Sequence, residues 1–470
     1  MAAAGVAAVG LRQVAIRAIG LGGTVVLARL LVPHDLGAVA FGTALVTAFG
    51  FAADAGIGAG LIRGRHTPDR QDLGAFLGLQ LTVTLLFAAA TAAIAAPFGQ
   101  VGRVTTLMVC SLPVAALRSP AVVLFERDLR YQRLVLVELA ETAVFYCWAI
   151  VTVLLGWGVW GLASATPFRA VFGAILMNAL SPAGFVMPIL SWTRVRGLLS
   201  FGLQYQAVGA VGLVRDQGLN VGIAVVAGVS VLGIWSLAYR ILQMPFLLFD
   251  SVWRVSFPAM SRLVAAGEET GPLIERGLAV AGIVTGGLLS VLVGSTPSLI
   301  PAVFGHQWTE ASEVVPWAAF GLMFGGPVSV ATAGYLYAVG DASSVLVSAI
   351  LHTVGWFVVA FPLLHLVGVQ AVGIGWLVGS LLEAAVLARA TRRHLPIKVM
   401  RLLALPAALA SVAGLTGWLV SSYLGPTLIS TLAGAAAAAT IYVLPIAAVR
   451  RSILVDTISL TRRAVTAMVK

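Results

Sequence analysis

The chain has little charge and almost no cysteine. Only 10% of its 470 residues are Asp, Glu, Lys or Arg, whereas charged residues make up about 25% of a typical soluble domain. Apolar residues account for 60% of the chain and the mean hydropathy is +1.00. These values exclude a soluble globular protein and predict a polytopic membrane protein. The two cysteines, Cys110 and Cys147, both lie in apolar segments, so we expect free thiols rather than a disulfide or a metal pair.

The motifs of the common catalytic and cofactor sites are also missing. No Walker-type phosphate loop occurs, and the six histidines do not have the spacing of metal ligands. The glycine-rich "GIGAG" at 56–60 lies in an apolar run rather than at a strand-to-helix turn, which excludes a dinucleotide site. The N-terminus has no basic region before its apolar stretch, so we do not expect a cleaved signal peptide. We expect no enzyme, no metal site and no cofactor.

Long apolar runs are what the chain has in abundance. A membrane-spanning helix needs about 20 mostly apolar residues, and we count fourteen such segments. They are 8–31, 37–62, 73–96, 104–124, 135–155, 159–180, 199–227, 229–257, 273–295, 312–338, 342–364, 369–390, 400–421 and 427–448. The sequence therefore predicts an all-α polytopic membrane protein with about 14 transmembrane helices.

The basic residues are distributed unevenly between the predicted loops. Of the 29 lysines and arginines, 22 fall in one set of loops and flanks, whereas the alternate set contains only Arg103. Basic residues are enriched on the cytoplasmic side of membrane proteins, so we expect both termini to be cytoplasmic. The net charge of +11 is then explained by topology, and we expect no nucleic-acid partner.

The two halves of the chain contain a weak internal repeat. "VPHDLGAVAFGTALVTAFGFAADAG" aligns with "GVSVLGIWSLAYRILQMPFLLFDSV" at an offset of 196 residues. The same offset places Asp54 on Asp250, and Arg17 within two residues of Arg215. Transporters are often built from such repeats, with the binding site between them.

The repeat predicts a division of the chain into three parts. Residues 1–196 form an N-terminal lobe of six spans, and 197–398 form a C-terminal lobe of six spans. Residues 399–470 add two spans and a cytoplasmic tail.

Several charged residues lie inside the predicted spans, where they should face the bundle interior or a watery cavity. Asp54 either contributes to function or accepts a hydrogen bond from a neighbouring helix. Arg29 and Arg240 either bind substrate or extend to the membrane interface. A structural role is favoured for four further residues: Glu138, Glu141, Arg169 and Glu383.

Ordered segments of the chain resemble one family. The segments are "LARLLVPHDLGAVAF", "DAGIGAGLIR", "LFERDLRYQRLVLVE", "LGWGVWGLA", "LAYRILQMPFLLFDSVWRVSFPAMSRL" and "FGHQWTEASEVVP". They resemble bacterial polysaccharide exporters of the multidrug/oligosaccharidyl-lipid/polysaccharide superfamily. The resemblance covers roughly residues 10–390 and is less clear over the last two spans.

The resemblance implies two six-helix lobes around a central cavity that opens alternately to the two sides of the bacterial cytoplasmic membrane. The cargo would be a polyprenyl-diphosphate-linked oligosaccharide, flipped to the outer leaflet for cell-surface polysaccharide synthesis. Implied partners are this lipid-linked glycan, membrane lipids, and glycosyltransferases or a polymerase of the same pathway.

Arginine binds phosphate oxygens well, which suggests roles for the charged and polar side chains of the spans. The diphosphate candidates are Arg17, Arg215, Arg29 and Arg240. The candidates for sugar contact are Gln13, Asn220, Tyr239 and Gln243. Asp54, Asp216 and Asp250 would either orient the arginines or couple transport to protons or sodium ions.

Three other functions stay open. The chain could flip the lipid-linked peptidoglycan precursor, or it could be a multidrug/cation antiporter of the same superfamily. A non-transporting membrane scaffold for glycosyltransferases is the third possibility. Arginines in the first span of each half argue against drug antiport, and the polar stripes inside the membrane argue against a scaffold.

Overall fold

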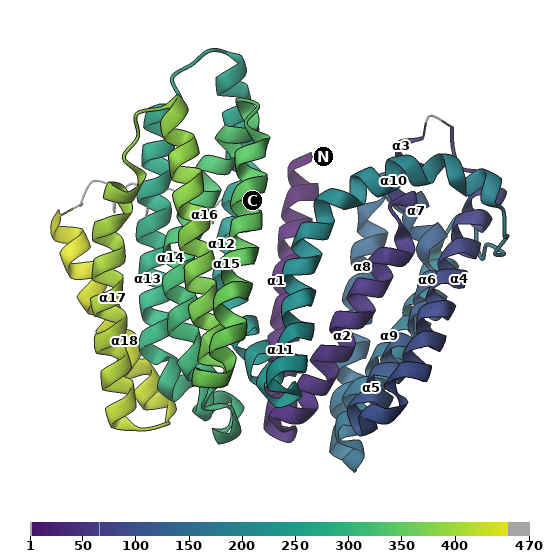
Figure 1. The fold of residues 1–470 in the computed structure, drawn as a ribbon, viewed down its shortest axis with the longest axis horizontal. Helices are drawn as coiled ribbons and strands as arrows, with labels where there is room; N and C mark the ends of the chain where they lie inside the picture. The colour runs from purple at the N-terminus through teal and green to yellow at the C-terminus, as the bar shows by residue number, and fades with distance from the viewer. Residues whose placement is uncertain (1, 65, 450–470) are drawn as a thin grey trace. The chain divides into compact units, whose positions relative to one another are not determined.

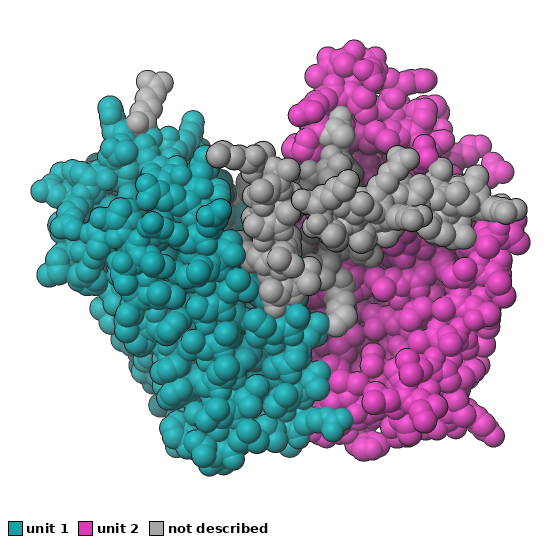
Figure 2. All heavy atoms as spheres, turned by 180° about the vertical axis from the view of Figure 1, so that it is seen from behind, with its two compact units in different colours: residues 1–233 teal, residues 234–470 magenta. Residues whose placement is uncertain are grey.

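The computed structural model describes residues 2–64 and 66–449, in which every regular element is a helix. The all-α prediction is therefore confirmed for this part of the chain. Side chains are not described for 2–15, 208, 244, 247, 248, 250–256, 259 and 449. The chain forms two compact units, residues 1–233 and 234–470 (Figure 2), and each is described by itself.

The first unit contains eleven α-helices and three short helical segments, together with the start of α12 (Figure 1). The elements are α1 (Ala2–Leu30), α2 (Pro33–Asp54), α3 (Ile57–Arg63), α4 (Arg70–Ala95), η1 (Ala96–Phe98), α5 (Gly99–Val109), α6 (Leu112–Ala116), α7 (Ser119–Arg127), α8 (Tyr131–Thr152), η2 (Val153–Trp157), α9 (Val159–Leu180), α10 (Trp192–Leu213), η3 (Val214–Gly218), α11 (Leu219–Ala227) and α12 (Val229–Ala265).

The second unit continues along α12 and adds six long helices. They are α13 (Gly271–Phe304), α14 (Ala311–Ala338), α15 (Ala342–Val367), α16 (Gln370–His394), α17 (Val399–Leu424) and α18 (Leu428–Val449), with the short η4 (His306–Trp308) after α13. The two units meet at 233/234, after α10 and α11, whereas the repeat predicts a boundary at 196/197. The lobe boundaries of the repeat stay a prediction.

Among the described residues, eleven helical stretches are long and apolar enough to cross a membrane. One of them, Arg70–Ala116, covers the predicted span at 73–96 and part of the one at 104–124. The start of α12 adds a shorter apolar helix, Val229–Gln243. Each of the fourteen predicted spans coincides with helix, so the chain is a multi-pass membrane protein. The count of fourteen is consistent with these helices and stays a prediction.

Several predicted spans are not one continuous α-helix in the described part of the chain. The span at 104–124 is divided into α5, α6 and α7, and Pro113 and Pro120 each lie in the first turn of a new helix. Proline lacks the N–H that a continuous helix needs. The span at 37–62 breaks between α2 and α3 at Ala55 and Gly56. The span at 199–227 contains the π-helical turn η3.

Both cysteines, Cys110 and Cys147, are free thiols with exposed side chains.

The first turns of α2 and α12 make a close reciprocal contact within the first unit. A Cβ added at Gly37 would lie 1.7 Å from the Val229 carbonyl oxygen, and one added at Gly233 would lie 1.9 Å from the Pro33 oxygen. Both contact pairs are related by the repeat offset of 196, since Pro33 corresponds to Val229 and Gly37 to Gly233. Only glycine permits this approach of two backbones.

In the second unit, α17 and α18 pack along α13. Small residues allow the approach: Gly294, Gly417 and Gly434 face one another, and an added Cβ at any of them would lie within 3 Å of a neighbouring helix. Hydroxyl groups bridge the same helices, because Ser421 Oγ donates to the Gly294 oxygen at 2.8 Å. Close helix contacts through small residues and hydroxyls are typical of membrane interiors. The two C-terminal helices are thereby built into this unit.

Candidate functional site

Arg215 and Asp216 form an ion pair inside the π-helical turn η3. Arg215 Nε donates to Asp216 Oδ1 at 2.8 Å, and each side chain is 36% exposed. In this stretch Asn220 Nδ2 donates to Gln217 Oε1 at 3.3 Å. The segment connects α10 to α11 (Figure 1) and packs against α2. Single π-helical turns occur frequently at functional sites, so this predicted cation lies on an irregular and accessible part of its helix.

Arg17 lies half-buried on α1, which packs against α8. The two helices meet through Tyr146 of α8: a Cβ added at Gly23 would lie 2.0 Å from its ring, and one added at Gly20 would lie 3.5 Å from its hydroxyl. Arg29 is exposed in the last turn of α1. The side chain of Gln13, a predicted sugar contact, lies outside the described residues. Arg17 is therefore the more enclosed of the two α1 arginines.

Asp54 lies at the end of α2 and stabilises the break that follows. Its Oδ2 accepts a hydrogen bond from the Gly56 N–H at 3.2 Å, and its Oδ1 accepts one from Gln80 Nε2 at 3.4 Å. Ala55 and Gly56 both have left-handed backbone conformations, with φ of 48° and 67°. A Cβ on Gly56 would also lie 2.1 Å from the oxygen of Gly202 on α10. The carboxylate thus orders a turn that packs on α10.

The repeat partner of Asp54 is in a different backbone setting. The helix α12 continues without interruption past Asp250 as far as Ala265, so the break after Asp54 has no counterpart. The side chain of Asp250 lies outside the described residues. The predicted equivalence of the two aspartates therefore holds for sequence position and not for local structure.

The predicted polar residues of α12 fall in the second unit. Tyr239 lies among aromatic rings, with ring centres 5.6 Å from Trp235 and 5.8 Å from Trp376. Arg240 and Gln243 are exposed. Arg240 follows Tyr239 directly, and Gln243 lies about one helical turn after Tyr239. The three residues therefore occupy a short stretch of α12.

A charged cluster in the first unit joins α8, α9 and Arg118, which precedes α7, and the sequence did not indicate this grouping. Glu141 on α8 is completely buried and pairs with Arg118 and with Arg169 Nε, the latter at 3.3 Å. The chain of α9 comes so close that a Cβ on Gly173 would lie 1.9 Å from Glu141 Oε1. Glu141 and Arg169 were individually assigned structural roles, but their pairing spans 28 residues of sequence and has no local signal.

The second unit contains an enclosed pair of titratable groups. His352 Nδ1 lies 2.7 Å from Glu383 Oε2, and the two side chains are only 8% and 21% exposed. The His352 ring is 5.8 Å from Trp356 and 6.4 Å from Trp376. In the part of the chain that the structure describes, no three His, Cys, Asp or Glu side chains come together as a metal site.

These arrangements differ in what they can do chemically. The Arg118–Glu141–Arg169 cluster holds its carboxylate completely buried, so its charges are committed to each other. The Arg215 pair differs in its carboxylate, because Asp216 is the adjacent residue and is 36% exposed rather than buried. An arginine in such a pair can exchange a carboxylate for a phosphate, since its planar donors match both groups.

Comparison with known proteins identifies the family. A family model described as "Polysaccharide biosynthesis protein" matches residues 26–313, which is more than half of the chain. The chain belongs to this family. The match confirms the expected relationship to proteins of polysaccharide biosynthesis.

Three relatives illustrate the similarity. The "Succinoglycan biosynthesis transport protein ExoT" of Rhizobium meliloti (strain 1021) is 21% identical over 307 residues, which cover 63% of this chain and 60% of that protein. A structure of "Lipid II flippase MurJ" has a TM-score of 0.74 at 13% identity, over 94% of this chain and 99% of MurJ. An inward-facing multidrug MATE transporter has a TM-score of 0.59 at 14% identity, over 82% and 94% of the two chains. The two structures show a shared fold, and all three relatives are transport proteins.

Proposed function

We propose that this protein flips a polyprenyl-diphosphate-linked oligosaccharide from the cytoplasmic to the outer leaflet by alternating access. The family match and the transport protein of succinoglycan biosynthesis support a role in cell-surface polysaccharide synthesis. The bias of basic residues to one set of loops supports cytoplasmic termini. The protein then works in the cytoplasmic membrane without chemical catalysis, next to glycosyltransferases or a polymerase that make and consume its cargo.

The observation that carries the proposal is the partly exposed Arg215–Asp216 pair in the π-helical turn of a membrane helix. Arg215 binds the diphosphate, and Asp216 holds the guanidinium in place when no cargo is bound. Arg17 supplies a second cation, with Arg29 and Arg240 at more exposed positions. A diphosphate has several anionic oxygens, so more than one arginine can bind it through charge-assisted hydrogen bonds.

The other predicted residues complete the proposal. Gln13, Asn220, Tyr239 and Gln243 contact the sugar, since amides and a phenol provide the donors and acceptors that hydroxyls need. Asp54 and Asp250 are the remaining candidates for ion coupling, by protons or by sodium ions. The hydrogen bonds of Asp54 to Gly56 and Gln80 support an additional structural role for its carboxylate.

The second candidate cargo is the lipid-linked peptidoglycan precursor. MurJ is named a lipid II flippase and has the same fold over nearly all of this chain. Both cargoes contain a lipid diphosphate, so the same arginines would bind either of them. The sugar therefore has to be distinguished by experiment.

A complementation experiment tests the proposal in cells. The gene is deleted, and surface polysaccharide is measured after restoring wild type, Arg17→Ala, Arg215→Ala or both. We expect each single change to reduce polymer and the double change to abolish it, with normal amounts of protein in the membrane. The matched control is Arg103→Ala, an exposed arginine of α5. Normal polymer from the double variant would refute the assignment, and lysis without loss of polymer would point to the peptidoglycan precursor.

A further inference from the structure

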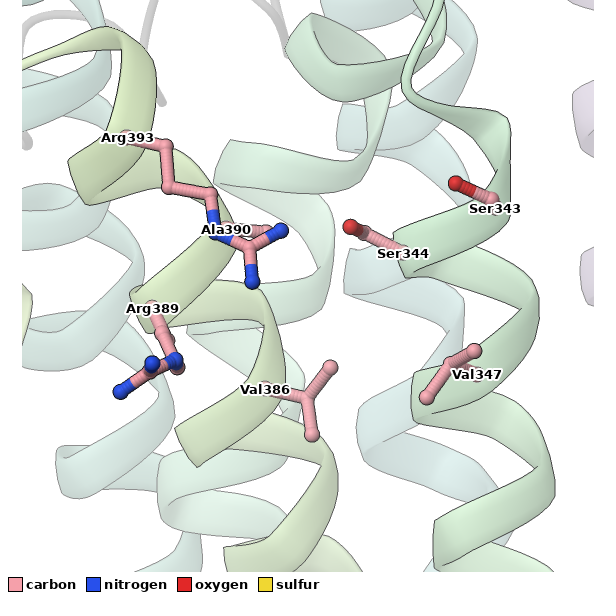
Figure 3. Close-up of a pocket in the computed structure, with 7 residues that line it drawn as sticks. All are labelled: Ser343, Ser344, Val347, Val386, Arg389, Ala390 and Arg393. Atoms are coloured by element: carbon pink, nitrogen blue, oxygen red, sulfur yellow. The ribbon is translucent and has the colours of Figure 1, made fainter.

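A cavity of about 360 Å³ lies between α15 and α16 in the second unit (Figure 3). It is far along the chain from every residue assigned to cargo. Its walls include two serines and a valine of α15 and two arginines and a valine of α16: Ser343, Ser344, Val347, Val386, Arg389 and Arg393. Binding sites for small ligands typically enclose about 300–1,000 Å³, so the cavity can hold a small polar head group.

One end of the cavity is cationic. Arg389 and Arg393 are one helical turn apart near the end of α16, and both are exposed. In Figure 3 the Arg393 guanidinium extends from α16 toward Ser344, whereas that of Arg389 points away from the serines. A long side chain can rotate, so both guanidinium groups can reach one anion at the mouth of the cavity.

The Asp341 carboxylate, at the start of α15, already has hydrogen-bond partners. Asp341 precedes α15 and accepts hydrogen bonds from Ser343 Oγ at 3.0 Å, Ser344 Oγ at 2.8 Å and Ser344 N–H at 3.2 Å. Its other oxygen contact is His394 Nε2, at 3.7 Å. The carboxylate therefore caps the helix, and the two guanidinium groups supply the charge of the cavity.

An apolar stripe continues from the cavity along α15. Val347, Leu351, Val354 and Val358 follow one another at helical spacing and are 46%, 37%, 48% and 64% exposed. In a membrane-spanning helix such a stripe faces lipid chains. The cavity lies at the polar end of the stripe, because α15 begins at Ala342 and α16 ends at His394. A free anion has no apolar part and would not contact these four residues, whereas the acyl chain of a lipid would.

We propose that this cavity binds the phosphate head group of an anionic membrane phospholipid, with its acyl chains along the stripe of α15. Basic pockets between membrane helices are suited to such head groups. Arg393 and Arg389 bind the phosphate oxygens, while Val347 and Val386 contact the glycerol and the first methylene groups. The site is separate from the proposed cargo arginines, and it does not depend on which glycan is transported.

Lipid binding to the purified full chain tests this site. Native mass spectrometry compares phosphatidylglycerol, phosphatidylcholine, inorganic phosphate and a polyprenyl diphosphate as probes. We expect phosphatidylglycerol to bind more strongly than phosphatidylcholine, and Arg389→Gln with Arg393→Gln to weaken phosphatidylglycerol binding about tenfold or more, since charge-assisted contacts are lost. The matched control is Arg392→Gln, an exposed neighbour outside the cavity, which should change binding by less than about twofold.

The remaining outcomes decide against the site or part of it. Equal binding of phosphatidylcholine, or an equal loss in the Arg392→Gln control, overturns it, because the arginines would then act only as general surface charge. If Arg389→Gln with Arg393→Gln weakens inorganic phosphate or the polyprenyl diphosphate more than phosphatidylglycerol, the phospholipid assignment is overturned. Val354→Asn should weaken phosphatidylglycerol without affecting inorganic phosphate, and unchanged lipid binding would refute the path of the acyl chains. All these readouts are independent of transport.

Discussion

The reciprocal contact of Gly37 and Gly233 should be sensitive to the addition of a single methyl group. At Gly37 an alanine Cβ would lie 1.7 Å from the Val229 oxygen, whereas real Cβ contacts essentially never fall under 3.0 Å. The first turns of α2 and α12 must therefore separate by about 1.3 Å. Because the obstacle is backbone, no side chain can rotate away to relieve it.

The expected free-energy cost follows from this geometry. Overpacking substitutions typically cost about 1–3 kcal/mol, and we place Gly37→Ala at the upper end, about 3 kcal/mol. Gly233→Ala should cost a similar amount, because its Cβ would lie 1.9 Å from the Pro33 oxygen. The double variant should cost less than the sum, since one separation of the helices relieves both clashes.

Thermal unfolding of the purified protein in detergent is the assay. Gly22→Ala and Gly212→Ala are matched controls, because an added Cβ at either position meets no atom within 4 Å. We expect both controls to melt close to wild type and both contact variants to melt clearly lower. Melting of Gly37→Ala at the wild-type temperature would refute the contact, and strictly additive losses would refute its reciprocal nature.

Three further substitutions give distinct expectations. Glu141→Gln should lower the free energy of unfolding by about 1–3 kcal/mol. This is less than the roughly 3–5 kcal/mol of a fully buried ion pair, because both arginines that pair with Glu141 are more than one-third exposed. An unchanged denaturant unfolding curve would contradict this expectation. Asp54→Ala should speed hydrogen exchange at the Gly56 N–H, because it removes the hydrogen bond to Asp54 Oδ2, which is worth about 1 kcal/mol. Asp54→Asn keeps an acceptor and should stay near wild type, and equal exchange in both variants would contradict the role of this bond. Hydrogen bonds from Ser344 lower the pKa of Asp341. The protection of the first amides of α15 from hydrogen exchange should therefore be complete above about pH 4. It should decline as the pH falls through the lowered pKa. Asp341→Asn should remove that pH dependence, and a decline that persists in the variant would assign it to another group.

The helices could be predicted from the sequence because hydropathy over 20-residue windows is a local property. All fourteen predicted segments coincide with helix. The breaks near Pro113 and Pro120 could not be predicted from residue type alone, because other prolines, such as Pro167 and Pro362, lie inside continuous helices. The break at Ala55 was harder to predict, because alanine rarely adopts positive φ and the turn depends on packing against Gly202.

The polar contacts were largely beyond prediction. Asp216 beside Arg215 is a local pair, and the sequence placed both residues in one span. The partners of Glu141 lie 23 and 28 residues away in sequence. The pairing of His352 with Glu383 depends on how α15 packs on α16. Such pairings require tertiary structure, which periodicity in a single sequence does not encode.

The most direct test of the central claim is flipping in proteoliposomes that contain only this protein and a fluorescent polyprenyl-diphosphate oligosaccharide. We predict that wild-type protein moves the labelled lipid between leaflets, that Arg17→Ala with Arg215→Ala prevents this movement, and that Arg103→Ala does not. Equal flipping by wild type and the double variant, or no flipping by any form of the folded protein, would contradict the account.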